Sequence, residues 1–184
     1  MKKIAIIIGS TRQNRQGERV GQWAHAVLKS RTDCAVDLID LRDWPLPFYA
    51  EPASPSALHG QYSHPIATQW AATIAQYHGF IIVTPEYNHG YSAVLKNALD
   101  YLYQEWNHKP VACIGYSSGN SGAIRAIEQL RQVFIELQMI PLQPEMNLCS
   151  VKQLFDEAGN TVDPKLADRL QRVVDSLIEF IIPQ

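Results

Sequence analysis

The sequence lacks the cysteine pattern of a disulfide-stabilised or zinc-binding protein. Its 3 cysteines, Cys34, Cys113 and Cys149, are far apart, odd in number and form no Cys-x-x-Cys pair. This spacing argues against a disulfide framework and against a structural zinc site. Cys34 and Cys113 lie in apolar runs, so we expect both to be small buried hydrophobic residues.

An excess of charge of either sign is also missing. The 16 lysines and arginines are balanced by 18 acidic residues, which gives a formal charge of −2. Nucleic-acid-binding proteins normally carry a basic excess, so we expect no nucleic-acid partner. No apolar run approaches the roughly 20 residues needed to cross a bilayer. We therefore expect no membrane partner and a cytoplasmic location.

Several catalytic and binding motifs are absent. No Gly-Lys-Ser/Thr closes the polar loop after the first apolar run, so this loop is not a P-loop. The G-x-G-x-x-G pattern of classical dinucleotide-binding folds and the G-x-S-x-G of serine hydrolases are missing too. The histidines show no H-E-x-x-H spacing. We therefore expect no metal and assign no side chain as an acid–base catalyst.

Short apolar runs instead alternate with longer amphipathic segments. This alternation is typical of a parallel sheet covered by helices on both faces. We predict strands at 4–8, 35–39, 79–84, 110–116 and 140–142, with extended structure running to 148. We predict helices at 18–30, 65–77, 92–103 and 122–138, and a last helix opened by Asp163 and Pro164. The order predicts one α/β domain over 1–184, with a doubly wound five-stranded parallel sheet.

Residues 40–65 interrupt this alternation. They contain prolines at 45, 47, 52, 55 and 65 and little periodic apolar pattern. We predict a long connection with at most a short helix, and connections of this length are usually functional or mobile. Its aromatic and apolar side chains either cover the protein's own core or face a partner subunit or the substrate. They are Trp44, Leu46, Phe48 and Tyr49.

Three loops at the carboxyl ends of predicted strands carry unusual chemistry, and ligands of open parallel sheets bind at these ends. Residues 9–17 offer hydroxyls, arginines and helix-start amides that suit a phosphate, although an ordinary polar turn explains them equally well. Residues 85–90 place polar and aromatic groups directly after a buried strand, which suits a planar ring. Residues 115–122 are small enough for close backbone approach to a ring edge, with a flexible surface loop as the alternative.

Together these segments resemble the NADPH-dependent FMN reductase family, which includes quinone, azo-dye and chromate reductases. The resemblance extends over about Lys3 to Leu142. It is carried by Gly9-Ser10-Thr11-Arg12, by Pro85-Glu86-Tyr87-Asn88-His89-Gly90 with Leu95-Lys96-Asn97-Ala98-Leu99-Asp100, and by the glycine- and serine-rich loop. It implies a flavodoxin-like fold, noncovalently bound FMN, NADPH or NADH as electron donor, and a homodimer or homotetramer.

The resemblance also implies three groups of cofactor-binding residues. The group around the FMN phosphate is Ser10, Arg12, Arg15 and Gly17. The group at the isoalloxazine ring and ribityl chain is Pro85, Glu86, Tyr87, Asn88 and Gly90. The group at the pyrimidine edge of the ring is Ser117, Ser118 and Gly119. We expect Lys96, Asn97 and Asp100 to be structural or interfacial.

The function implied by the resemblance is an FMN-dependent NAD(P)H oxidoreductase. It would reduce quinones, azo compounds, free flavin or similar small-molecule acceptors by ping-pong hydride transfer, with the chemistry carried by the flavin. A second hypothesis is a flavin-binding electron carrier or redox-sensing module that docks on a partner protein. The near-neutral charge and the aromatic residues of the 40–65 connection leave this alternative open. No motif in the sequence distinguishes NADPH from NADH or identifies the physiological acceptor.

Overall fold

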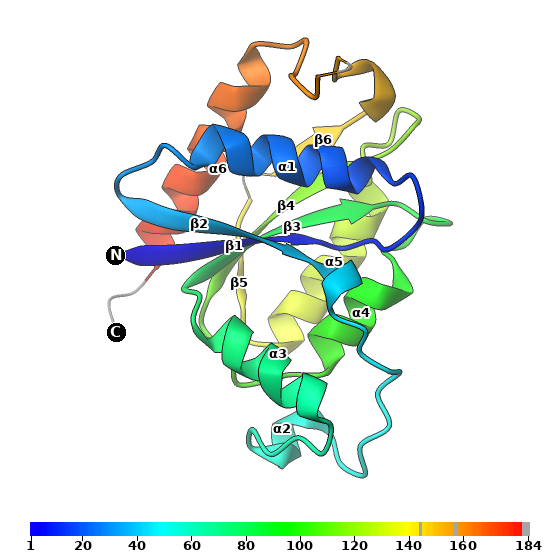
Figure 1. Ribbon diagram of the computed structural model, residues 1–184, viewed down its shortest axis with the longest axis vertical. Helices are drawn as coiled ribbons and strands as arrows, with labels where there is room; N and C mark the ends of the chain where they lie inside the picture. Colours follow the sequence, from blue (N-terminus) through cyan, green and yellow to red (C-terminus); the bar gives the residue numbers. More distant parts are fainter. Residues whose placement is uncertain (144, 157, 182–184) are drawn as a thin grey trace.

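The computed structural model describes residues 1–143, 145–156 and 158–181. The first half of the chain contains β1 (Lys2–Ile8), α1 (Gln16–Leu28), β2 (Cys34–Asp40), the 3-10 helix η1 (Leu41–Asp43), α2 (Pro55–Leu58), α3 (Pro65–Ala75) and β3 (Gly79–Pro85). The second half contains α4 (Ala93–Asp100), β4 (Pro110–Tyr116), α5 (Ile124–Glu136), β5 (Ile140–Pro141), β6 (Met146–Leu148), the 3-10 helix η2 (Val151–Gln153) and α6 (Lys165–Phe180) (Figure 1). The predicted strands and long helices are all present, with ends shifted by a few residues, as is usual for helix termini.

The strands form one parallel sheet in the order β2-β1-β3-β4-β5, with β6 also paired to β4. This is the flavodoxin-like order, in which the direction of winding reverses between β1 and β3. The predicted fifth strand is split, because the chain pairs with β4 at Ile140 and Pro141, leaves it, and rejoins it at Met146. The sheet therefore has six strands rather than five. Pro141 has no amide hydrogen, so it cannot donate to a continuous ladder.

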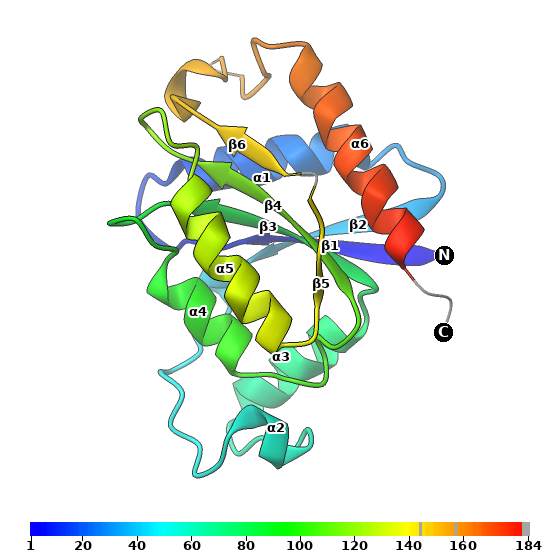
Figure 2. The same cartoon turned by 180° about the vertical axis from the view of Figure 1, so that it is seen from behind.

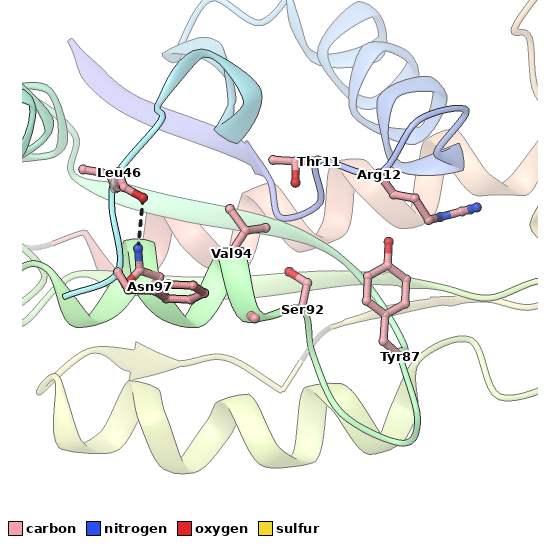
Figure 3. A pocket seen from close by; sticks show the side chains of 9 residues that line it. Thr11, Arg12, Leu46, Tyr87, Ser92, Val94 and Asn97 are labelled. Atoms are coloured by element: carbon pink, nitrogen blue, oxygen red, sulfur yellow. Dashed lines mark hydrogen bonds between the residues drawn. The ribbon is translucent and has the colours of Figure 1, made fainter.

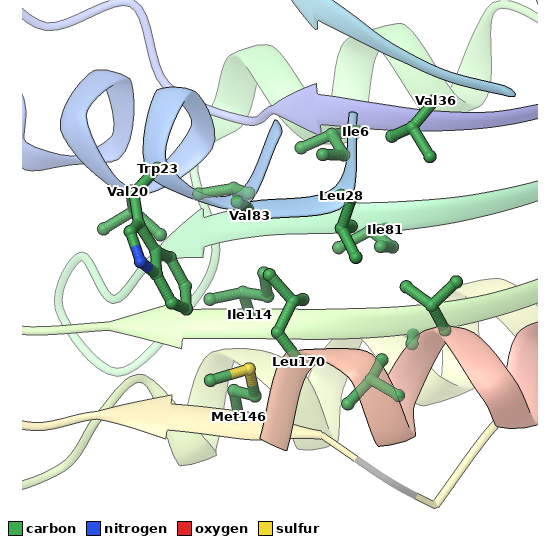
Figure 4. Packing of buried hydrophobic residues seen from close by; sticks show 14 of the residues in the cluster. Ile6, Val20, Trp23, Leu28, Val36, Ile81, Val83, Ile114, Met146 and Leu170 are labelled. Atoms are coloured by element: carbon green, nitrogen blue, oxygen red, sulfur yellow. The ribbon is translucent and has the colours of Figure 1, made fainter. Parts of the chain in front are cut away.

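Helices cover both faces of the sheet, as the alternation predicted. On one face α1 packs over β1 and β2 and α6 packs over β3 and β4, and Figure 4 shows Trp23 and Leu170 within this layer. On the opposite face α3, α4 and α5 cover side chains of alternate strand positions, and Figure 2 shows these three helices from behind. Among the described residues, no helix is long and apolar enough to span a bilayer.

The connection between β2 and α3 contains only η1 and the one-turn helix α2. Three of its apolar residues fold back on the protein's own core. The ring centroid of Trp44 lies 4.9 Å from that of Trp70, and the ring centroid of Tyr49 lies 5.3 Å from that of Tyr101. Leu46 packs against the same hydrophobic cluster, whereas Phe48 is 82% exposed. Of the four aromatic and apolar residues singled out in this connection, Phe48 is therefore the one whose side chain faces away from the core.

Lys109 is a buried cation at the opposite end of the sheet from the predicted ligand loops. Its Nζ donates to the carbonyl oxygens of Ile74 and Ala75 at the end of α3, and it lies 5.7 Å from the ring centroid of Phe80. Burial lowers the pKa of Lys109 from 10.5 to about 8. The folded protein therefore binds this proton more weakly than the unfolded chain does.

We expect Lys109→Met to raise the free energy of unfolding by about 1–2 kcal/mol at pH 7, because the substitution removes a cation that is costly to bury. This value is smaller than the one that the whole pKa shift would give, because the amine keeps some contact with solvent. The unfolded state binds more protons between pH 8 and 10.5, so the wild-type free energy of unfolding rises across this window. The advantage of the variant should shrink over the same window. Urea denaturation of both proteins at several pH values measures it, and a constant difference would contradict the assignment.

Candidate functional site

The loop after β1 is tied to the loop after β3 by several hydrogen bonds. The amide of Gly9 donates to the carbonyl of Val83 at 2.8 Å, and the Oγ of Ser92 donates to the carbonyl of Gly9. Ser10 is fully buried, with its Oγ 3.1 Å from the Oη of Tyr87. The structure therefore brings the first two predicted loops together, and Ser10 and Tyr87 meet directly.

Arg15 lies beneath the first loop rather than on its open side. Its side chain is fully buried, with Nη1 donating to the carbonyl of Ser10 and Nη2 to the carboxylate of Asp40 at the end of β2. Among the described residues, no hydrogen-bond partner is found for its Nε. Of the Arg15 guanidinium group, Nε is therefore the donor left for a phosphate. The other two nitrogens, Nη1 and Nη2, hold the first loop to β2. Arg12 is exposed and keeps its guanidinium group outside these contacts.

Unpaired polar atoms gather at the amino terminus of α1. Of the four buried side-chain nitrogen and oxygen atoms without a partner in the described residues, three are Arg15 Nε, Gln16 Oε1 and Tyr116 Oη. Burial raises the pKa of Tyr116 to about 12, so its hydroxyl keeps its proton and can donate. Helix amino termini attract anions through their free amides and dipole. Arg15 Nε and Tyr116 Oη are donors and fit a phosphate, whereas Gln16 Oε1 is an acceptor and does not.

Gly17 fits tightly at the start of α1. A Cβ there would lie 2.5 Å from the Oη of Tyr116. Such a contact is far inside van der Waals distance, so a side chain at this position displaces Tyr116 or the helix. Gly17 was predicted to lie near the phosphate. In the structure, its lack of a side chain allows the start of α1 to pack closely against Tyr116 at the end of β4.

The loop after β3 is a two-residue turn. Tyr87 and Gly90 exchange backbone hydrogen bonds of 2.8 and 2.9 Å, and Asn88 and His89 both have positive φ angles, 52° and 69°. Positive φ at both central residues is the property of a type I′ turn, and asparagine tolerates it well. Pro85 ends β3 just before this turn. The aromatic ring of Tyr87 stands beside Arg12 of the first loop (Figure 3).

Helix α5 holds this turn from the other side. The carboxylate of Glu86, whose side chain is 5% exposed, accepts hydrogen bonds from the backbone amide and the guanidinium of Arg125. Gln129 Nε2 donates to the carbonyl of His89 at 2.8 Å. Neither partner is predictable from the sequence. Both lie about 40 residues further along the chain on the polar face of an amphipathic helix, so no local pattern marks them.

The loop after β4 is anchored to the segment after β6. The Oγ of Ser117 donates to the carbonyl of Gly119 and accepts from the amide of Gly122, both at 2.9 Å. Ser118 and Gly119 are exposed, and a Cβ at Gly119 would meet nothing within 4 Å. Gly122, by contrast, has φ +54°, and a Cβ there would lie 2.7 Å from the Cβ of Asn147. The glycine that this loop requires is therefore Gly122, which was not among the predicted residues.

A cavity of about 480 Å³ adjoins the first two loops. Figure 3 shows the labelled side chains that line it. The lining residues are Thr11, Arg12, Leu46, Phe48, Tyr87, Ser92, Ala93, Val94 and Asn97. No group of three or more potential metal-ligating side chains occurs in the described part of the chain. The neighbouring Lys96 and Asp100, which we expect to be structural or interfacial, form an i,i+4 ion pair on α4.

Comparison with known proteins places the chain in a family. The family model of NADPH-dependent FMN reductases matches residues 2–153. An NAD(P)H-dependent FMN reductase of a Nectria species is 42% identical over 165 residues, covering 88% of this chain and 78% of the relative. A 2-hydroxy-1,4-benzoquinone reductase of a Burkholderia species is 32% identical over 186 residues, covering 97% and 96%. The solved flavoenzyme NAD(P)H:acceptor oxidoreductase of Paracoccus denitrificans has the same fold, with a TM-score of 0.80, 24% identity and coverage of 98% and 97%. The chain belongs to the NADPH-dependent FMN reductase family.

Proposed function

We propose that this protein binds FMN in the three loops at the carboxyl ends of β1, β3 and β4 and reduces small-molecule acceptors with NAD(P)H. The observation that carries the proposal is the group of unpaired buried polar atoms at the start of α1, beside a buried Ser10. Bound FMN would supply the hydride chemistry. For a quinone, the overall reaction consumes NAD(P)H, the quinone and one proton, and yields NAD(P)⁺ and the hydroquinone.

The residues of the chain bind and orient the reactants rather than act as acids or bases. We propose that Ser10, Arg12 and the amides before Gly17 hold the FMN phosphate, with Arg15 as the residue that shapes their loop. The turn at 85–90 would support the ring and ribityl chain, and residues 117–119 would meet the pyrimidine edge. The carboxylate of Glu86 is already paired with Arg125, which supports a role for Glu86 in shaping the turn.

Reconstitution with FMN tests the proposal. The loaded protein should absorb near about 450 nm, as flavoproteins do, and should oxidise NADPH when a quinone is present. A protein that takes up no FMN would contradict the proposal. A flavin-loaded protein without turnover would favour an electron carrier that docks on a partner.

We expect Arg125→Ala to weaken FMN binding about 5- to 30-fold. The substitution leaves the nearly buried carboxylate of Glu86 without its cation, at a cost of about 1–2 kcal/mol, so the turn at 85–90 loses its support. Quenching of flavin fluorescence on titration measures the change. Arg131→Ala removes an ion pair from the same helix and serves as the control. Equal FMN affinity of wild type and Arg125→Ala would show that the ion pair between Glu86 and Arg125 does not support the cofactor loop.

We also propose that the chain self-associates as a homodimer or homotetramer. Ile124 and Ile135 are 47% and 65% exposed and lie 11 residues apart on one face of α5, with the Glu128–Arg131 ion pair between them, which supports a contact surface of mixed apolar and charged character there. Sedimentation velocity at micromolar concentration should give a dimer or tetramer, and a monomer alone would contradict the proposal. The three free cysteines suit a reducing compartment, which supports the proposed cytoplasmic location.

A further inference from the structure

The cavity of about 480 Å³ adjoins the proposed FMN loops without coinciding with them. Of its lining residues, only Arg12 and Tyr87 belong to the proposed cofactor-binding set, and none comes from the loop after β4. Thr11 comes from the loop after β1, and the other walls come from α4, from the turn before it and from the connection after β2. The cavity therefore flanks the cofactor loops on the α4 side and leaves room for a second molecule.

The outer wall of the cavity is the 46–49 segment, which belongs to no helix or strand. It is held by one side chain of α4. Asn97 Nδ2 donates to the carbonyls of Pro47 at 2.9 Å and Leu46 at 3.4 Å, and its Oδ1 accepts from the amide of Tyr49 at 3.0 Å. Figure 3 shows the contact between Asn97 and Leu46. The amide of Asn97 thus satisfies backbone groups of an extended segment as a neighbouring strand would.

This anchoring fixes where Phe48 lies. Leu46 and Tyr49 pack into the core on one side of the segment, while Phe48 remains 82% exposed and lines the cavity. A single exposed aromatic residue is common on protein surfaces. Phe48 is informative because it is positioned at a cavity wall beside the proposed flavin loops, on a segment whose backbone is pinned.

The chemistry of the walls defines the ligand class. Leu46, Phe48 and Val94 present apolar surface, and no carboxylate of the described residues lines the cavity. The charged group in its lining is Arg12, whose guanidinium is assigned to the FMN phosphate under the proposed function. The amide of Asn97 is already engaged with backbone groups, so it offers little to a polar ligand. Pockets of this size and character hold small, mainly apolar molecules. A planar, uncharged system of one or two rings suits them, whereas a highly hydrated anion does not.

We propose that the cavity is the acceptor site and that the 46–49 segment, which forms its outer wall, determines which acceptors bind there. Phe48 contacts the ring of the acceptor, and Asn97 is a positioning residue that holds Phe48 in place. This inference rests on the proposed function and adds to it the residues that select the acceptor. The segment favours planar apolar acceptors over hydrophilic ones.

Acceptor selectivity tests the inference on flavin-loaded protein. The probes are menadione, a planar two-ring quinone, and ferricyanide, a hydrophilic anion. Phe48→Ala should lower the ratio of kcat/KM for menadione to kcat/KM for ferricyanide by about 5- to 20-fold, mainly through KM for menadione, because the ring loses apolar contact. Phe180→Ala, at a half-exposed phenylalanine on α6, is the matched control and should leave the ratio as in wild type.

Asn97→Ala tests the positioning role separately. It should lower the same ratio in the same direction, because the 46–49 segment loses the three hydrogen bonds that it makes with Asn97. A fall in both kcat/KM values together would overturn the positioning role, since it indicates general structural damage. A wild-type ratio in Phe48→Ala overturns the inference while leaving flavin binding intact. Failure of the wild-type protein to take up FMN instead overturns the proposed function, so the two failures are distinguishable.

Discussion

Arg15→Met should destabilise the protein by about 2–4 kcal/mol and prevent normal FMN loading. The methionine keeps most of the buried volume but leaves Asp40 without its cation and the carbonyl of Ser10 without its donor. Breaking one side of a buried ion pair generally costs about 3–5 kcal/mol. We expect somewhat less here because the side chain of Asp40 is 22% exposed. Urea denaturation of the FMN-free protein measures the stability change.

A double variant separates the charge effect from the loop effect. Arg15→Met combined with Asp40→Asn removes the unpaired carboxylate, so much of the lost stability should return. FMN affinity should remain low, because the carbonyl of Ser10 still lacks the guanidinium that fixes the first loop. Recovery of both stability and FMN affinity in the double variant would show that Arg15 serves only to neutralise Asp40.

The meeting of the first two loops of the candidate site was predictable because parallel strands end at a common edge. Buried runs at β1, β3 and β4 were each followed by an unusual loop, and the sheet order places β1, β3 and β4 side by side. The contact between Ser10 and Tyr87, 77 residues apart, follows from that topology. Hydrophobic periodicity predicted the strands and their common edge, and the flavodoxin-like fold implied by the family resemblance supplied the strand order that makes β1 and β3 neighbours.

The side chains that support these loops were not predictable in the same way. Arg15 with Asp40, Glu86 with Arg125, and Asn97 with the 46–49 segment are pairs distant in sequence. Each partner is a polar residue, and from the sequence alone it could equally well be a solvent-exposed surface residue without a specific contact. Their pairing depends on the rotation of α1, α4 and α5 about their axes, which apolar periodicity fixes only to within a side chain or two.

The roles of the glycines were also not predictable from the sequence. Gly119, predicted to lie at the cofactor, has open space where a side chain would stand, while Gly122 is required by its positive φ and by Asn147. Sequence alone does not distinguish a glycine that leaves room for a ligand from one that leaves room for the protein. Gly17 belongs to the second class in its geometry, because Tyr116 occupies the space where its side chain would stand.

Gly17→Ala should therefore destabilise the protein by about 1–3 kcal/mol, although alanine favours a helix over glycine by up to about 1 kcal/mol. The new methyl group meets the Oη of Tyr116 and displaces the start of α1, so FMN affinity should fall about 10-fold or more through the phosphate loop. Fluorescence titration and urea denaturation measure the two effects.

Tyr116→Phe should relieve this clash. It removes a buried hydroxyl that has no partner, so alone it should leave the stability of the FMN-free protein unchanged or slightly higher. Combined with Gly17→Ala, it should restore part of the lost stability, because the nearest remaining contact is the ring carbon at 3.0 Å. Simple additivity of the two changes would contradict a direct contact between Gly17 and Tyr116. Loss of FMN affinity in Tyr116→Phe alone, without loss of stability, would identify this hydroxyl as a donor to the bound phosphate.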